Sequence, residues 1–187
     1  MPSKNISPTP PAQFIGYSSV KNAGTTHVLR NFTGNGTLRF SNGDSYEGAF
    51  INGKQDGNGK YWFKNGSYYE GHYSQGQRAG IGTLKHFDGS CYAGNFLFGL
   101  KSGKGTQKYV NGDIYYGDWK DGKRHGTGVY IFSCGNEQLV GQWSAGEFSA
   151  GKWVINDSME YEGKFKFNEP HGDGKWVFSN GVIAGRL

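Results

Sequence analysis

Proline is scarce in this sequence and nearly confined to one end of it. Four of the 5 prolines (Pro2, Pro8, Pro10 and Pro11) lie within residues 1–13, together with Ser and Thr. We therefore predict a flexible arm over residues 1–13. Glycine, in contrast, makes up 33 of 187 residues. High glycine with so little proline excludes collagen and proline-rich linkers.

Cysteine is also scarce, and long apolar runs are missing. The 2 cysteines, Cys91 and Cys134, have no zinc-type partner spacing, so we interpret them as reduced thiols. No stretch approaches the roughly 20 apolar residues that a transmembrane helix needs. Residues 1–8 contain no apolar core of a signal peptide. These absences predict an intracellular protein without integral membrane association.

Acidic residues are absent from the first 43 positions. That segment carries Lys4, Lys21, Arg30 and Arg39, which account for most of the formal charge of +5. A nucleic-acid-binding protein is expected to carry a basic stripe along its folded part. The remaining residues are nearly balanced in charge, so we expect no nucleic-acid partner.

The most prominent feature of the sequence is a repeated five-residue signature, aromatic–x–Gly–x–aromatic. It starts at Tyr46, returns three times at steps of 23 residues, and continues at steps of 24 and 22. A fixed period of this length indicates a repeat architecture. The six units cover residues 46–68, 69–91, 92–114, 115–138, 139–160 and 161–183, with a short tail to residue 187. Residues 14–45 are interpreted as a diverged first hairpin repeat with an inserted loop.

Each unit is predicted to form one β-hairpin. With the first aromatic counted as position zero, apolar residues recur at 0, +4, +15 and +17, which places them on one side of two strands. Glycines at +7 and +20, such as Gly53 and Gly66, are expected to supply the positive φ of turns. Stacked hairpins would form a twisted all-β ribbon about 65–70 Å long.

Glycines also occur inside the predicted strands, at +2 and +13, where they weaken a strand by about 0.5–1 kcal/mol. Gly48 and Gly59 are the first such pair. We predict that an aromatic ring from the adjacent strand lies across the missing side chain. The fifth unit has Lys152 at +13 and so departs from this pattern.

No set of residues in the sequence predicts catalysis. The Gly-x-Gly pairs lack the third glycine and the following helix of a dinucleotide loop. His125 and His171 share a turn position that other units fill with Asp56, Ala79 or Ser102, so we interpret it as a turn position. We expect no enzymatic activity, no metal site and no cofactor.

Apolar residues opposite the predicted ring face are the candidate partner surface. Trp62, Ile131, Ile155 and Val177 fall at +16, and Tyr116 falls at +1. Exposed aromatic and aliphatic residues in a row can mark a partner surface. Twist of the ribbon or a self-association contact could equally cover them, and the sequence leaves these alternatives open.

The segment Tyr115–Gly128 closely resembles the MORN repeat, written Y-x-G-x-W-x-x-G-x-x-x-G-x-G. Six matching units extend the resemblance over residues 46–183. It implies an all-β fold, an elongated single-layer antiparallel sheet of stacked MORN-repeat β-hairpins. It also implies a role in protein–protein interaction.

A narrower resemblance concerns the 24- and 22-residue steps and the ending Gly163–Phe178, which are similar to the radial spoke head protein 1 family. It implies a non-catalytic scaffold subunit of the radial spoke head of motile cilia and flagella. Its location would be the axoneme, reached from the cytoplasm, and its partners other radial spoke head proteins, with a homodimer as a further option. The alternative is an adaptor at membranes or the cytoskeleton outside cilia.

Overall fold

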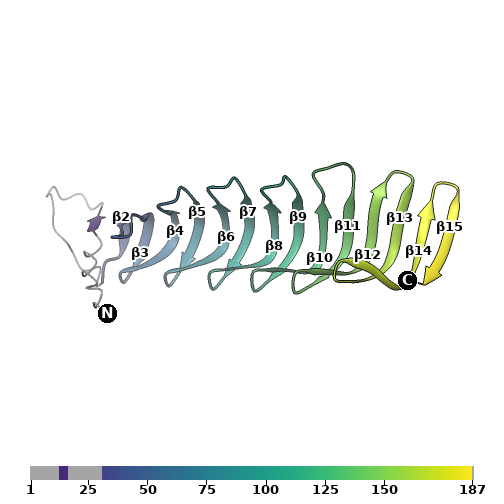
Figure 1. Cartoon of the computed structure of the whole chain (residues 1–187). Coiled ribbons are helices and arrows are strands. Elements are labelled where there is room, and N and C mark those ends of the chain that lie inside the picture. The colour runs from purple at the N-terminus through teal and green to yellow at the C-terminus, as the bar shows by residue number, and fades with distance from the viewer. Residues whose placement is uncertain (1–12, 17–30, 187) are drawn as a thin grey trace, which may run out of the picture.

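The chain folds into one antiparallel sheet of 15 strands, in a computed structural model that describes residues 13–16 and 31–186. Each strand pairs with its neighbours in sequence, so the hairpins stand in a single row (Figure 1). The strands are β1 (Gln13–Gly16), β2 (Gly34–Arg39), β3 (Ser45–Ile51), β4 (Lys54–Trp62), β5 (Tyr68–Ser74), β6 (Gln77–Lys85), β7 (Cys91–Leu97), β8 (Leu100–Lys108), β9 (Ile114–Lys120), β10 (Lys123–Ile131), β11 (Gln138–Ser144), β12 (Glu147–Asn156), β13 (Met159–Lys166), β14 (Glu169–Phe178) and β15 (Gly181–Arg186). The predicted single-layer antiparallel fold is confirmed. Apart from Gln13, the predicted arm lies outside the described residues.

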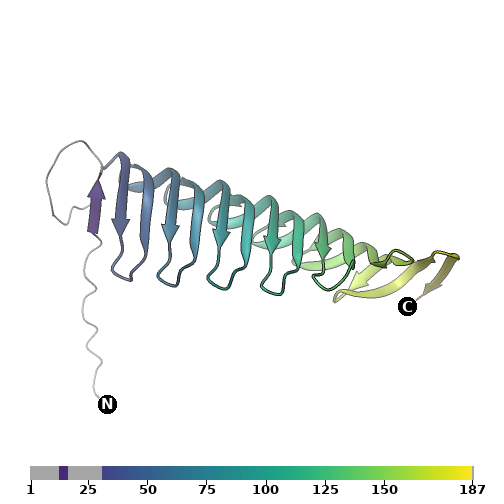
Figure 2. The same ribbon diagram turned by 90° about the horizontal axis from the view of Figure 1, so that it is seen from above.

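The sheet is elongated, with β2 and β15 near its opposite ends (Figure 1). Figure 2 shows that the row of hairpins twists along its length, so the last strands are rotated relative to the first. Strand twist of one hand accumulates in any extended sheet. At about 4.8 Å per strand, the row spans about 65–70 Å.

Tight turns close the hairpins, as the glycine positions predict. In the β3–β4 turn, Asn52 and Gly53 have φ angles of 50° and 77°. The turns that join successive hairpins also place glycine in the left-handed region, for example Gly66 at 88°. Two central residues with positive φ match the twist of the flanking strands. The predicted turn roles of the +7 and +20 glycines are confirmed.

A row of glycines crosses the sheet, one from each strand. Gly48 of β3, for example, pairs with Gly36 on one side and Gly59 on the other. This glycine row consists of Gly16, Gly36, Gly48, Gly59, Gly71, Gly82, Gly94, Gly105, Gly117, Gly128, Gly141, Gly151, Gly163, Gly174 and Gly185. A methyl group on Gly71 would lie 2.5 Å from the Cα of Gly82, so the two strands leave no room for side chains here.

Aromatic rings cover the glycine row on one side, which we call the ring face. A Cβ on Gly82 would collide with the ring of Tyr69 from the adjacent strand, as predicted. The Tyr69 hydroxyl donates a hydrogen bond to the His72 carbonyl at 3.0 Å. Its ring meets Tyr73 and Phe96 edge to face, with centroids 5.2 and 5.0 Å apart. Since Phe96 belongs to the next hairpin, the rings form one core that runs from repeat to repeat.

The fifth repeat keeps the glycine row by a route that the sequence pattern missed. Lys152 occupies the +13 position, but Gly151 pairs with both Gly141 and Gly163. The bulge in this hairpin contains one residue fewer than the bulge in the first hairpin, and this brings Gly151 into register. The repeat is therefore regular in space although its spacing in sequence is not.

Candidate functional site

Three of the five predicted surface residues lie in one cross-strand row of the face opposite the rings, here the outer face. Trp62, Ile131 and Val177 belong to this row on β4, β10 and β14. Several strands separate them, so they do not form one patch. Whether they contact a partner remains a prediction.

Ile155 does not share this row, contrary to the sequence pattern. The pairing of β12 with β13 shifts between Val154 and Asn156, which leaves Ile155 at the irregularity. Val154 takes its place, opposite Gln138. The shortened fifth repeat is the cause, because it moves every later residue of β12 by one position.

Tyr116 stands at the centre of a denser apolar group on the outer face. It pairs with Val129, and Ile114 pairs with Ile131 on the same two strands. Val140 follows on β11, next to Val129. Tyr116 is 49% exposed and Val140 is 36% exposed. We call Ile114, Tyr116, Val129, Ile131 and Val140 the apolar patch.

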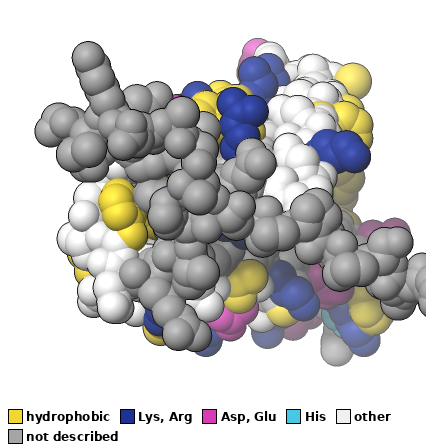
Figure 3. Space-filling model, turned by 90° about the vertical axis from the view of Figure 1, so that its left-hand side faces the viewer, with side chains coloured by type: hydrophobic (Ala, Val, Ile, Leu, Met, Phe, Trp, Pro, Cys, Tyr) yellow, Lys and Arg dark blue, Asp and Glu magenta, His cyan; other side chains and the backbone are white. Residues whose placement is uncertain are grey.

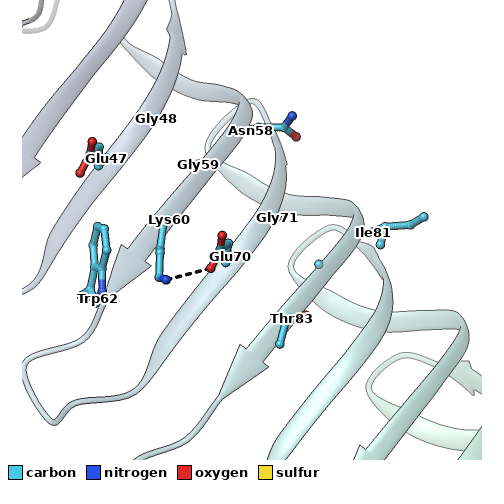
Figure 4. A pocket seen from close by; sticks show the side chains of 11 residues that line it. Glu47, Gly48, Asn58, Gly59, Lys60, Trp62, Glu70, Gly71, Ile81 and Thr83 are labelled. Atoms are coloured by element: carbon cyan, nitrogen blue, oxygen red, sulfur yellow. Dashed lines mark ion pairs between the residues drawn. The ribbon is translucent and has the colours of Figure 1, made fainter.

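Shallow grooves run along the outer face of the sheet, at some distance from this patch as well as beside it. One, of about 690 Å³, has the backbone of Gly48, Gly59 and Gly71 as its floor and Trp62 and Glu70 among its walls. Figure 4 shows Lys60 and Glu70 joined across the strands, with Trp62 beside them. The Lys60–Glu70 ion pair measures 2.8 Å. The groove is open to solvent, and apolar, charged and backbone groups all line it.

Opposite charges neutralise each other over much of the outer face. Lys104 pairs with Asp118 at 2.8 Å, and this hydrogen bond holds the pKa of Asp118 below its ordinary value. Lys152–Glu160 and Lys175–Glu162 form similar pairs near the C-terminal end. At the N-terminal end of the sheet, seen in Figure 3, described side chains of both charges also lie among hydrophobic ones.

The ring face carries a charge pattern that sequence reasoning missed. Arg78, Lys101 and Arg124 recur at a 23-residue step and lie over the aromatic rings. Their constant step was visible in the sequence, but the position falls next to a turn and was not singled out. We call these three residues the cationic strip.

Acidic groups in two of the joining turns, half-buried Asp44 and buried Asp113, have a structural role. Tyr61 donates to the carboxylate of Asp44 at 2.7 Å, and the Lys64 backbone N–H donates at 2.8 Å. The Tyr61 hydrogen bond contributes most to lowering the pKa of Asp44. Asp113 accepts equivalent bonds from Tyr130 and Ser133. These two carboxylates tie their turns to the next strand, so their acceptor oxygens are already occupied.

In the described part of the chain, no group of three or more His, Cys, Asp or Glu side chains is arranged so that it could hold a metal ion. Cys91 and Cys134 are free thiols, the first half-buried and the second exposed. Nor does any described residue belong to a helix that could cross a lipid bilayer.

Comparison with known families matches the hairpins to the MORN repeat. The matches cover residues 30–45, 46–68, 69–91, 92–114, 115–136 and 161–183, more than half of the chain. The chain belongs to the MORN repeat family. The matches skip residues 137–160, where β11 and β12 still form a MORN-like hairpin with its glycines in register. MORN repeat proteins are generally non-catalytic adaptors, and this membership indicates a protein-interaction or scaffold role.

No curated protein matched the sequence. Among solved structures, the chain is similar to the SAS-4 (dCPAP) TCP domain of Drosophila melanogaster, in complex with a proline-rich motif of Ana2 (dSTIL). The identity is 15%, the TM-score is 0.37, and the match covers 80% of this MORN repeat chain and 70% of the other. A likeness this weak carries no functional argument.

Proposed function

We propose that this MORN repeat protein is a non-catalytic scaffold subunit of the radial spoke head of motile cilia. The observation that carries the proposal is the unequal repeat spacing, with steps of 24 and 22 residues before the ending Gly163–Phe178. These features resemble the radial spoke head protein 1 family. In this role the chain docks other spoke-head proteins and is located in the axoneme.

An extended sheet suits such a role because its contact surfaces are spread along its length. The apolar patch lies on β9 to β11, whereas the groove beside Trp62 lies on β3 to β6. Repeat proteins use such elongated surfaces to engage several partners. One face can therefore hold two neighbours in a fixed order and spacing.

A tagged copy of the chain in ciliated cells tests the proposal. We expect the tag along the axoneme, and we expect axonemes that lack the chain to have incomplete spoke heads. A complete spoke head in its absence would overturn the proposal.

The apolar patch allows a matched comparison in the same cells. Tyr116→Glu with Val129→Glu should reduce incorporation into the axoneme, because two charges would enter an apolar contact. Phe87→Glu, at an exposed turn residue outside the patch, should incorporate normally. Equal incorporation of both variants would exclude the patch as the docking site.

The second candidate is an adaptor at membranes or the cytoskeleton outside cilia. The basic first 43 residues favour it, since anionic lipid attracts Lys and Arg side chains. Flotation with anionic vesicles tests it, using a variant in which Lys4, Lys21, Arg30 and Arg39 are replaced by Gln. Binding that is lost in this variant would support the adaptor role, and absence of binding by the unmodified chain would exclude a membrane role.

A further inference from the structure

The cationic strip occupies one position of three successive hairpins. Arg78 lies on β6, Lys101 on β8 and Arg124 on β10, and each pairs across its hairpin with the second aromatic of the repeat. Two strand spacings separate consecutive members, so the three charges stand about 10 Å apart. All three side chains are half-buried and still reach solvent.

Each member of the strip lies over aromatic rings. The Arg124 guanidinium carbon is 4.3 Å from the ring centroid of Trp143, and the Lys101 ammonium is 4.8 Å from that of Trp119. Arg78 lies 5.4 Å from the ring of Phe96. Such contacts fix the direction of a cation but leave its charge uncompensated.

No carboxylate neutralises the strip within residues 13–16 and 31–186. The four ion pairs found there involve other lysines. Arg78 donates instead to the Gly99 carbonyl at 2.7 Å, and Arg124 donates to the Gly146 carbonyl at 2.6 Å. Burial lowers the pKa of Lys101 to about 8, and Arg78 adds to this effect. A half-buried cation without an anion is costly to keep.

Ring packing alone does not require a cation at this position. The equivalent residue is Gln55 in the hairpin before the strip. It is Phe148 and then Pro170 in the two hairpins after it. All three sit opposite the second aromatic of their repeat, just as the strip residues do. The positive charges of the cationic strip are therefore not needed for the hairpins to fold.

A cavity adjoins the C-terminal end of the strip. It holds about 220 Å³ and is lined by Arg124, Tyr130, Phe132, Leu139, Trp143 and Asn168. A carboxylate side chain that entered it would meet the Arg124 guanidinium among apolar ring surfaces. Low polarity around such a pair strengthens the attraction between the charges.

We propose that the cationic strip docks an acidic segment of a partner protein, with carboxylates about 10 Å apart. In a polyproline II segment, which rises about 3.1 Å per residue and returns to the same side every third residue, that spacing corresponds to every third residue. The carboxylates would pair with the three cations while the intervening residues lie against the rings. This inference names a partner class for the proposed scaffold function, but it does not depend on the cellular location.

A labelled synthetic peptide provides the test. The probe has 12 residues, with Glu at every third position and Gly or Ser between, and its binding to the full chain is followed by fluorescence anisotropy at low salt. We expect binding that weakens as salt is added. The triple variant Arg78→Gln, Lys101→Gln, Arg124→Gln should raise the Kd at least tenfold. Gln55 shows that this position accepts glutamine in a folded hairpin.

A matched control removes the same net charge elsewhere. Lys54→Gln, Lys120→Gln and Lys123→Gln change three exposed lysines near hairpin turns. This control should bind the peptide as the unmodified chain does. If the triple strip variant fails to fold by circular dichroism, Lys101→Gln alone serves, with an expected rise in Kd of about threefold.

Equal loss of binding in strip and control variants would overturn the proposal, because only net charge would then matter. An unchanged Kd in the strip variant would also overturn it. So would strip-dependent binding to phosphatidylserine vesicles without binding to the peptide, which would assign the strip to a membrane. Axoneme location is tested separately, so failure of the spoke-head proposal would be distinguishable from failure of this one.

Discussion

Gly82 lies under the ring of Tyr69, so a single methyl group there is a sensitive probe of the core. A Cβ at Gly82 would overlap the Tyr69 hydroxyl and ring carbons. We expect Gly82→Ala to lower the free energy of unfolding by about 1–3 kcal/mol, the usual effect of overpacking. Urea denaturation measures the change. Lys120→Ala on the exposed surface is the control, and similar losses for both would contradict the packing described here.

Phe98 is a residue whose backbone conformation does not suit its side chain. Its φ is 49°, in the left-handed region, and its side chain is 75% exposed. A left-handed conformation costs roughly 1–2 kcal/mol for most residues and less for asparagine. We therefore expect Phe98→Asn to raise the free energy of unfolding by about 1 kcal/mol in thermal denaturation.

Phe87 is a suitable comparison for this change, because it is 71% exposed in another turn and has negative φ. Phe87→Asn should leave stability nearly unchanged. A loss of stability in Phe98→Asn would show that the ring makes contacts that outweigh the strain. Reduced incorporation into an assembly, with stability raised, would identify Phe98 as a contact residue.

At the scale of the hairpin, the sequence predicts most of the structure. Period, turn glycines and ring positions are local properties, so they could be predicted from residues such as Gly53 and Tyr69. The register of the fifth repeat could not, because its bulge depends on pairing with both neighbouring strands. The same effect moved Ile155 out of its predicted row and brought in Val154.

This shift of register gives a test at the fifth hairpin. Gly151 faces Gly141, and a Cβ on Gly151 would lie 2.8 Å from the Gly141 Cα. Gly151→Ala should therefore destabilise the sheet by about 1–3 kcal/mol. Lys152→Ala should cost less than about 1 kcal/mol, because it removes only the ion pair with Glu160 at the surface. A larger loss of stability for Lys152→Ala than for Gly151→Ala would show that Lys152 occupies the glycine row, as its +13 position in the sequence predicts.

The candidate contact surfaces combine residues from several hairpins, so they were less predictable from the sequence than the hairpins themselves. The apolar patch combines residues from three strands, and only Tyr116 and Ile131 were singled out from the sequence. The cationic strip combines Arg78, Lys101 and Arg124, which are far apart in sequence and become neighbours along one face because the hairpins stack in order. Their contacts with rings required the side-chain directions that only the folded sheet supplies.

The ring core also sets the pH dependence of the whole molecule. Burial raises the pKa of Tyr69 and Tyr115 to about 12 in the folded chain. Burial, together with the charge of Asp56, does the same for Tyr46. In the unfolded chain these phenols ionise near pH 10. The stability from these raised pKa values is fully present below pH 10 and is lost as the pH rises towards 12.

We therefore expect the sheet to unfold cooperatively between pH 10 and 12. Far-ultraviolet circular dichroism should report loss of the sheet, and absorbance at 295 nm should report phenolate formation. The part of the absorbance change that comes from the buried tyrosines should coincide with loss of the sheet, since each buried ring is shared between neighbouring hairpins and cannot ionise without breaking the hydrogen bond from Tyr69 to His72 or its equivalents. Complete phenolate formation near pH 10, buried tyrosines included, with the sheet intact would show that the core rings are accessible to water, and the continuous core described here would be wrong.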